Sequence, residues 1–388
     1  YKRQPWLLLI VAPATWVLVE WLRGWVLSGF PWLAIGYSQV DTALAGWAPV
    51  FGIYGVSYMA VLSATSILVA LLTQGKQRWV ALGLILLPLI VGGLLKFVDW
   101  TQPAGEPVRS TLIQAGVSQD EKWRPENLQP TLEFYRSATW QARDSEIVVW
   151  PEVAIPSLDD RVEPYIQALQ SDTRGTGRSI LFGILERDQS RGESRTYNSV
   201  ILVAGDRRQS YRKRHLVPFG EYFPVPPRVR EWMRMMSLPH SDLSPGDDVQ
   251  PLLEAANGEK LAVAICYEDA YGAEQLYALP DASILINVSN DAWFGDSIAP
   301  HQHLQIARMR SLEVGRPSIR ATNTGISAFI DHTGELLDSG AQFEAVTMTM
   351  DVQPRRGSTP YAAIGNKPVI GLCFIILAGF WLRNRANL

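Results

Sequence analysis

Three side chains that can act together on a carbonyl carbon occur along this chain in the order Glu, Lys, Cys. Cys266 comes directly after the strand-like run LAVAI, Glu152 comes shortly after the strand-like run IVVW, and Lys213 lies in YRKRHLVPFGEYFP. A carboxylate can take the proton of a thiol, and a fixed ammonium can balance the negative charge that develops on a carbonyl oxygen under attack. These residues predict nucleophilic chemistry at a thiol, without a histidine.

Each residue alone has a simpler interpretation. Glu152 can cap a helix after Pro151, and Lys213 can belong to a solvated basic patch with its charged neighbours. Cys266 can be a small buried hydrophobe, the commoner fate of cysteine. The other cysteine, Cys373, lies in the last apolar run, so we do not expect a disulfide between them. Two of the three residues follow apolar strands, where α/β proteins place reacting side chains, and this favours the catalytic interpretation.

The elements that would position these residues form an α/β pattern. Strand-like runs are expected at 110–114, 147–150, 179–185, 198–204, 261–265, 283–288, 327–330 and 346–352. Helix-like stretches are expected at 125–142, 162–172 and 301–314. The alternation predicts a mixed or parallel sheet covered by helices. QPAGEP at 102–107 is the expected linker into this domain.

Apolar segments surround this domain. The stretches 42–75 and 79–95 contain no charged residue, and the stretches 5–19 and 368–382 are weaker candidates with charged ends. Each of the first two can cover, or nearly cover, the roughly 20 residues that a membrane-spanning helix needs. The two weaker stretches would rely on their charged ends reaching the interface. We therefore expect membrane helices in residues 1–98, a catalytic domain in 99–360, and a last membrane helix with a cytoplasmic tail in 361–388.

Basic residues predict the orientation of these spans. They gather at three sites, Lys2 with Arg3, Lys76 with Arg78, and Arg383 with Arg385. If all three sites are cytoplasmic, the catalytic domain lies on the outer face of the membrane. The formal net charge of −3 argues against a nucleic acid partner. No cleavable signal peptide is visible, and the start at YKRQPW without Met suggests a truncated N-terminus.

Five stretches carry a resemblance to a known family. They are WPEVAIP (150–156), YRKRHLVPFGEYFP (211–224), AICYE (264–268), SNDAWFG (289–295) and ARMRSLEVGRP (307–317). Together they resemble the apolipoprotein N-acyltransferases, the membrane-bound branch of the nitrilase (carbon-nitrogen hydrolase) superfamily. The resemblance extends from RGWVLSGFPW, which begins at Arg23, to the last span. That family usually carries eight spans, whereas we count four here, which we attribute to the missing start.

The resemblance implies a fold and a set of site residues. The fold is a nitrilase-like α-β-β-α sandwich inserted between transmembrane helices. Glu152, Lys213 and Cys266 take the places of the family's Glu-Lys-Cys triad, and Glu221 is a second acidic residue that supports it.

Other residues match family positions around the triad. Tyr267 and Glu268 match positions beside the nucleophile, where we expect them to position Cys266. Trp123 matches a tryptophan on a mobile arm that helps substrates enter. Phe219, Tyr222 and Phe223 are candidates for an apolar rim, although aromatic residues in such loops are more often plain packing.

The resemblance also implies the reaction. The family moves a fatty acyl group from a phospholipid, typically phosphatidylethanolamine, to the α-amino group of the diacylglyceryl-cysteine of an apolipoprotein, in the bacterial inner membrane with the catalytic domain in the periplasm. A single thiol suits a ping-pong route through a thioester. We expect no cofactor and a monomer. A metal is not expected either, because His301 and His303 have no matching ligand cluster at zinc-site spacing. Asn290 and Asp291 are expected to shape the pocket.

Two other functions use the same residues. A membrane-tethered amidase or nitrilase would pass the acyl group to water, and the triad alone does not separate it from a transferase. The apolar spans and RGWVLSGFPW favour lipid substrates. A membrane-anchored binding protein with an inert domain is the second alternative, and the presence of all three chemical groups argues against it.

Overall fold

The structure divides into two units by its internal contacts. The computed structural model describes residues 5–190, 194–225, 228–229 and 243–385. Residues 1–102, 308–315 and 357–388 form a helical unit, and residues 103–307 and 316–356 form a sheet unit. Lys2 and Arg3, which contribute to the predicted orientation, lie outside the described residues.

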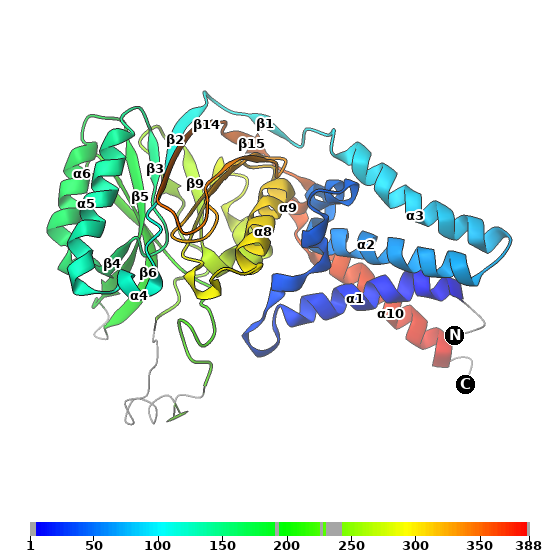
Figure 1. Ribbon diagram of the computed structural model, residues 1–388. Helices are drawn as coiled ribbons and strands as arrows, with labels where there is room; N and C mark the ends of the chain where they lie inside the picture. The colour runs from blue at the N-terminus through cyan, green and yellow to red at the C-terminus, as the bar shows by residue number, and fades with distance from the viewer. Residues whose placement is uncertain (1–4, 191–193, 226–227, 230–242, 386–388) are drawn as a thin grey trace. The chain divides into compact units, whose positions relative to one another are not determined.

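The helical unit confirms the four predicted spans. Among the described residues, four helices are long and apolar enough to cross a membrane: α1 (Leu8–Arg23), α2 (Ala48–Leu72), α3 (Lys76–Leu95) and α10 (Lys367–Arg385). Helix α1 contacts both α2 and α10, and α2 also contacts α3 (Figure 1). Large apolar side chains such as Leu71 and Trp79 remain exposed on these helices. Such exposure is expected of surfaces that face lipid.

A break near the start of α2 is explained by packing within the helical unit. Gly52 has a φ of +66°, and a Cβ at this position would lie 2.3 Å from a ring carbon of Tyr361 in the short helix α9 (Pro360–Ile364). Only glycine adopts this positive φ readily and also leaves room for the ring of Tyr361. The helix resumes at Ile53, whose N–H donates to the carboxylate of Glu313 at 2.5 Å. Glu313 therefore caps the longer part of α2.

The sheet unit contains two β-sheets. The first has the strand order β14-β2-β3-β5-β6-β7, and β4 pairs with β5 outside this path. Its members are β2 (Val108–Gln114), β3 (Ile147–Val149), β4 (Ile155–Leu158), β5 (Ser179–Asp188), β6 (Arg195–Ala204), β7 (Arg207–Arg212) and β14 (Val346–Val352). Strands β2, β3 and β5 are parallel, whereas β6, β7 and β14 pair in antiparallel fashion.

The second sheet has the order β13-β12-β11-β10-β9-β8. Its members are β8 (Leu253–Glu254), β9 (Lys260–Ile265), β10 (Ile284–Ser289), β11 (Ser318–Thr322), β12 (Ala328–Ile330) and β13 (Leu336–Ser339). Strands β9, β10 and β11 are parallel. Two short strands, β1 (Thr101–Pro103) and β15 (Arg355–Gly357), lie where the chain passes between units.

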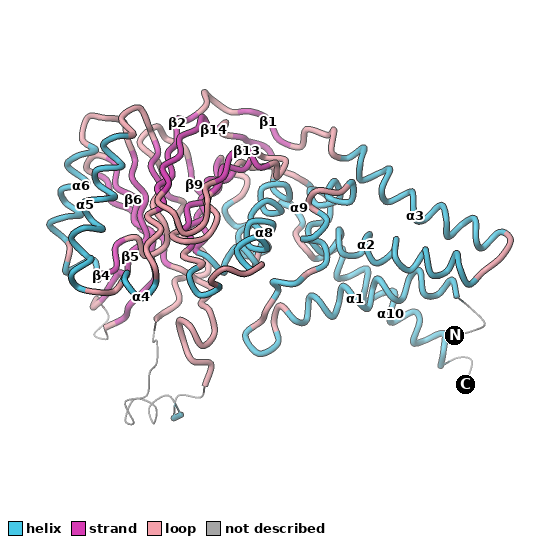
Figure 2. The backbone as a smooth tube through the Cα atoms, viewed as in Figure 1, coloured by secondary structure: helices cyan, strands magenta, loops and turns pink. Residues whose placement is uncertain are grey.

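Apolar side chains of both sheets form one core. Leu112 and Leu181 of the first sheet pack in a single buried cluster with Val263 and Ile286 of the second. The outer face of the first sheet is covered by α5 (Pro125–Gln141) and α6 (Glu163–Thr173) (Figure 2). On the second sheet, Ala307 of α8 (Ala299–Val314) packs against β12. The layers are therefore α-β-β-α, as the family resemblance implies.

Residue patterns explain which strands are predictable. Strand β9 is apolar and buried from Leu261 to Ile265, which is typical of a parallel strand covered on both faces. Helix α5 begins with Pro125 at its first position and buries Leu132, Tyr135 and Ala138 on one side. All eight expected strands and all three expected helices are present, with ends shifted by up to three residues. The sequence does not predict the strands β1, β4, β7, β8, β11, β13 and β15.

Candidate active site

Cys266 lies in a strained turn at the end of a buried strand. It follows the last residue of β9 and begins the 3-10 helix η7 (Cys266–Ala270). Its φ is +52°, in the left-handed region that side chains with a Cβ rarely adopt. Such strain concentrates at functional sites and requires firm support from the surroundings. The turn places the thiol at the carboxyl edge of the second sheet, as the sequence predicts.

Glu268 supplies that support. Its buried carboxylate accepts the backbone N–H of Ile265 at 2.7 Å and the backbone N–H of Arg214 at 2.8 Å. The hydroxyl of Tyr211 donates to the same carboxylate at 3.0 Å. One carboxylate thus joins the residue before Cys266 to the residue after Lys213. Burial raises the pKa of Glu268, although the surrounding donors and Arg214 oppose that shift.

We expect Glu268→Gln to loosen this connection. The amide can accept fewer hydrogen bonds and adds two donors where the structure provides only donors, so the cost should be about 1–3 kcal/mol of stability with a loss of activity. Thermal unfolding and the rate of Cys266 alkylation measure the two effects. Glu274→Gln, in the neighbouring 3-10 helix η8 (Gly272–Ala278), is the matched control. Equal behaviour of the two variants would contradict this role of Glu268.

Glu152 occupies a second constrained turn, after β3 in the first sheet. The next residue, Val153, has a φ of +45°. A Cβ on Gly183 of β5 would lie 2.4 Å from the Val153 nitrogen and 2.7 Å from the Glu152 Cα. The turn therefore rests directly on the β5 backbone, and only glycine at position 183 allows this approach. This support fixes where the Glu152 carboxylate points.

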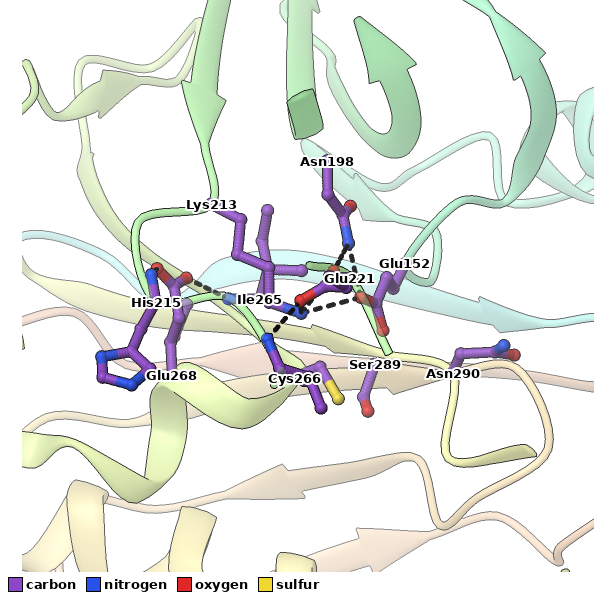
Figure 3. Close-up of polar contacts among 12 residues, drawn as sticks. Glu152, Asn198, Lys213, His215, Glu221, Ile265, Cys266, Glu268, Ser289 and Asn290 are labelled. Carbon is purple, nitrogen blue, oxygen red and sulfur yellow. Dashed lines mark hydrogen bonds and ion pairs between the residues drawn. The ribbon is translucent and has the colours of Figure 1, made fainter. Parts of the chain in front are cut away.

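Lys213 is buried between two carboxylates. Its Nζ lies 3.3 Å from Glu152 Oε1 and 2.9 Å from Glu221 Oε2, and the side chain is 1% exposed. Asn198 of β6 donates to Oε1 of Glu152 at 2.7 Å and to Oε1 of Glu221 at 2.8 Å. Figure 3 shows these four side chains together with Cys266. The structure therefore brings Glu152, Lys213, Cys266 and Glu221 to one site.

Charges at this site shift the pKa values of the reacting groups. Burial alone would lower the pKa of Lys213, but the carboxylates of Glu152 and Glu221 hold it above its usual value, so the lysine stays cationic. Burial raises the pKa of Cys266 well above that of a free thiol, Glu152 pushes it in the same direction, and Lys213 opposes both. The resting group is a neutral thiol that needs a nearby base.

A polar network supports the other side of Cys266. Asp291, at a φ of +52°, accepts from Ser289 at 2.6 Å, contacts His303 Nδ1 at 2.8 Å and pairs with Arg320 at 2.8 Å. His303 Nε2 lies 3.2 Å from the main-chain oxygen of Cys266. Burial alone would raise the pKa of Asp291, but His303 and Arg320 hold it below its usual value.

Three residues in and beside this network, Cys266, Asp291 and His303, lie close enough together to be considered as metal ligands. Potential ligand atoms of Cys266, Asp291 and His303 lie within 4.8 Å of one another, a proximity that linear spacing does not reveal. Both oxygens of Asp291 and both ring nitrogens of His303 already have protein partners. Within the described residues, Asp291 and His303 are thus satisfied by hydrogen bonds and ion pairs, and we assign these two residues to positioning Cys266.

A pocket of about 540 Å³ reaches Glu152 and Glu221. Its wall includes Lys122, Trp123, Asn290 and Trp293. The indole of Trp123 is 47% exposed and that of Trp293 is 74% exposed. Trp293 was quoted in the SNDAWFG stretch but not assigned a role, because that stretch alone does not show which side chain faces the pocket.

The remaining predicted residues lie near the triad in different surroundings. Phe219 is 67% exposed at a φ of +64°, and its ring stands edge-on to Phe223 at 6.1 Å. The main-chain oxygen of Tyr222 accepts from the N–H of Phe219 at 2.7 Å. Tyr267 is buried, and its ring packs edge-on against Tyr271 at 5.3 Å.

Sequence reasoning missed two side chains that contact Glu152. Asn198 appears as the polar first residue of a predicted strand, and a buried asparagine there is the only signal. Lys122, the last residue of α4 (Gln119–Lys122), donates from Nζ to the main-chain oxygen of Glu152 at 3.1 Å. Its position next to Trp123 in EKWRPE does not reveal that contact.

Comparisons with known proteins decide the family. Residues 111–361 match the carbon-nitrogen hydrolase family, and residues 1–66 match the apolipoprotein N-acyltransferase N-terminal domain. The apolipoprotein N-acyltransferase of Methylococcus capsulatus is 44% identical over 98% of this chain and 75% of its own length. The protein of that name from Nitrosomonas europaea is 42% identical over 97% of this chain and 75% of its own length. The chain belongs to the apolipoprotein N-acyltransferase family.

Membership in this family establishes an acyltransferase with a nitrilase-type catalytic part and membrane helices. Among solved structures, an amidase of the nitrilase superfamily from Nesterenkonia is similar at 16% identity, covering 67% of this chain and 95% of that one, with a TM-score of 0.49. Saccharomyces cerevisiae Nit3 is similar at 19% identity, covering 66% of this chain and 93% of that one, with a TM-score of 0.49.

Proposed function

We propose that this acyltransferase moves a fatty acyl chain from a phospholipid, through a thioester on Cys266, to the α-amino group of the diacylglyceryl-cysteine of an apolipoprotein. Phosphatidylethanolamine is the proposed donor. The observation that carries the proposal is the convergence of a thiol on a strained turn with a buried Glu152–Lys213 ion pair. The names of the relatives support the acceptor, and the four apolar helices support a donor dissolved in the bilayer.

In the first half-reaction the donor ester is cleaved. Glu152 takes the thiol proton as the sulfur of Cys266 attacks the ester carbonyl carbon. Negative charge on the carbonyl oxygen is stabilised by the Lys213 ammonium and the backbone N–H of Tyr267. The carbon–oxygen bond of the ester then breaks, and Glu152 returns its proton to the departing lysophospholipid alcohol. The products are the thioester and a lysophospholipid.

The second half-reaction uses the same groups. Glu152 takes a proton from the attacking α-amino group of the acceptor, and the new carbon–nitrogen bond forms at the thioester carbonyl. Lys213 again stabilises the oxyanion. The carbon–sulfur bond then breaks, and the departing sulfur receives the proton from Glu152. Glu221 and Asn198 hold the side chains of Lys213 and Glu152 in position through both steps.

The location and state of the protein belong to the same proposal. We place the protein in the bacterial inner membrane as a monomer, with the sheet unit facing the periplasm. The support is the clustering of basic residues at the predicted cytoplasmic ends, such as Lys76, Arg383 and Arg385. Domain boundaries near residues 99 and 360 follow from the same arrangement of spans.

Intact-mass analysis tests the proposed thioester. The purified chain, incubated with phosphatidylethanolamine vesicles, should gain the mass of one acyl chain and lose it again in neutral hydroxylamine. Addition of a diacylated lipopeptide should transfer the acyl chain to the peptide amine. Release of free fatty acid at the same rate without acceptor would instead favour the amidase alternative. A folded protein that forms no adduct would contradict the proposal.

A further inference from the structure

Lys122 is a buried cation that forms no salt bridge with a carboxylate among the described residues. Its side chain is 4% exposed, and it lines the pocket that reaches Glu152. Within the described part of the chain, its Nζ forms no ion pair within 4.0 Å and donates to the main-chain oxygen of Glu152 at 3.1 Å. Burying an ammonium that no carboxylate pairs with directly costs free energy of folding. Lys122 is therefore a candidate for a functional role.

The contact with Lys122 adds a second support to the turn that contains Glu152. Gly183 of β5 supports the turn that contains Glu152, and the adjacent Val153 is held at a φ of +45°. A strained turn keeps its shape only when contacts fix it from several directions. Lys122 supplies a charged hydrogen bond to the main chain of Glu152 itself, so its loss should let the carboxylate move.

Lys122 is a second cation beside the paired charges of the site. Glu152 and Glu221 share the single ammonium of Lys213, so this group of three side chains carries one net negative charge. The electrostatic interaction with Glu152 favours the protonated form of Lys122. Lys122 is therefore a second positive charge in the pocket that Glu152 and Glu221 line.

The other end of the same short helix contacts the loop after β10. The side-chain amide of Asn290 donates to the Gln119 side-chain oxygen at 2.8 Å. Asn290 precedes Asp291, which contacts His303 next to Cys266. Helix α4 is thus attached to the turn of the base at Lys122 and to the loop beside the nucleophile at Gln119. Trp123, which follows directly, stands at the pocket wall.

We propose that Lys122 is a positioning residue for acyl transfer, which holds the main chain of Glu152 and places a positive charge beside it, so that the carboxylate is aligned to take the Cys266 proton. This inference rests on the proposed role of Glu152 as the base. It assigns a function to a residue outside the triad. Acyl transfer would then depend on the position of α4, which carries Lys122.

Protonation of Lys122 gives the inference a distinctive pH dependence. Burial lowers the pKa of Lys122 to about 8, and Glu152 opposes that shift. The charge is therefore present below about pH 8 and lost above it, so thioester formation should slow as the pH rises through that value. Ionisation of the thiol would act in the opposite direction, because alkaline pH increases the thiolate. The charged groups that line the same pocket as Lys122 are Glu152 and Glu221, and Lys213 pairs with both of these carboxylates. On the helix of Lys122 itself, Asp120 and Glu121 are exposed.

Two substitutions of Lys122 test the inference. Lys122→Met fills the site but removes the charge and the donor, and it should slow thioester formation by about 10- to 100-fold, the size of effect that a misplaced catalytic group produces. The residual rate of thioester formation by Lys122→Met should no longer decline as the pH rises through about 8. Lys122→Arg keeps the charge at all accessible pH values and should move the decline to higher pH. Lys260→Met, at an exposed lysine paired with Asp281, should behave as wild type.

The measurement is the initial rate of thioester formation against pH, by intact mass, on full-length folded protein with phosphatidylethanolamine vesicles. Thermal unfolding confirms folding, and if Lys122→Met does not fold, the pH profile of Lys122→Arg decides. A wild-type rate and pH profile in folded Lys122→Met, or an unmoved decline in Lys122→Arg, would overturn the inference. Glu152→Gln separates the two proposals. Only the inference about Lys122 fails if three results are found together: wild type forms the thioester, Glu152→Gln forms none, and Lys122→Met matches wild type. If wild type forms no thioester, the proposed function fails.

Discussion

Cys266→Ala is expected to abolish both the acyl adduct and transfer to the acceptor, and Cys373→Ala is expected to leave both nearly unchanged. Only Cys266 lies at the strained end of β9 beside Glu152 and Lys213. Cys373 is buried in α10, within the helical unit. The site should also accommodate alanine, because the substitution removes the sulfur atom and adds no volume. Intact mass with phosphatidylethanolamine vesicles and lipopeptide acylation measure the two results.

Cys266→Ser makes the test more specific. A hydroxyl ionises at a much higher pH than a thiol, and the site already raises the pKa of Cys266 well above its usual value through burial and Glu152. A carboxylate is too weak a base to ionise serine there, so turnover should fall on the order of 10⁴-fold or more, as when a nucleophile is removed. Unfolding should be unchanged. Near-normal turnover would show that the site does not use thiolate character, and equal losses from Cys266→Ala and Cys373→Ala would contradict the assignment.

The position of Cys266 was predictable because a local signal specifies it. The run Leu261–Ile265 is uniformly apolar, which indicates a covered strand, and the acidic pair after Cys266 marks its end. The same reasoning placed Glu152 at the end of β3. The family resemblance then related both to Lys213. Local pattern and resemblance together therefore indicated the three residues that the fold brings to one site.

Contacts between distant segments were not predictable in the same way. Asn198 and Lys122 both contact Glu152, yet they lie in β6 and α4 and are separated from it by tens of residues. Linear spacing shows no ligand cluster that matches His303, and its contact with Asp291 forms only when α8 packs beside the loop after β10. Pairings of this kind depend on tertiary geometry, which a pattern of residue types does not contain.

Unpredicted strands have a physical explanation as well. Strand β7, RRQSYR, lies at an edge and carries charged residues on its exposed positions, so it lacks the apolar alternation that identifies strands. Strand β11, SIRAT, is buried throughout but contains Arg320, whose charge is satisfied by Asp291 and by other groups of the network. A buried arginine interrupts the apolar pattern, although ion pairing makes it compatible with the core.

Glu152→Gln is expected to separate base catalysis from thiol ionisation. The amide keeps the size of the side chain and the contact with Asn198 but does not accept a proton, so thioester formation should slow by about 100- to 10,000-fold. At the same time the negative charge that raises the pKa of Cys266 is gone. The thiol pKa should fall, and alkylation by iodoacetamide should move to lower pH. A faster-reacting thiol with slower acyl transfer is the expected combination. Glu335→Gln, at an exposed glutamate, is the control.

Lys213→Met should shift thiol ionisation in the opposite direction. Lys213 lowers the pKa of Cys266, so its removal should raise that pKa and move alkylation to higher pH. Loss of one oxyanion-stabilising group commonly costs about 3–4 kcal/mol, so acylation should slow by roughly 100- to 1,000-fold. Because Glu152 and Glu221 then lose their shared cation, thermal unfolding must be followed in parallel, with Lys260→Met as the matched control.

Opposite shifts of the alkylation curves would assign the two charges separately. Both variants lose acyl transfer, so activity alone does not distinguish a base from an oxyanion partner. The thiol does distinguish them, because one variant removes a negative charge beside Cys266 and the other a positive charge. Rates of iodoacetamide labelling against pH, measured on folded wild type and both variants, make the comparison. Shifts of the same sign would contradict the electrostatic assignment, and a Lys213→Met enzyme that acylates Cys266 at the wild-type rate would remove Lys213 from the mechanism.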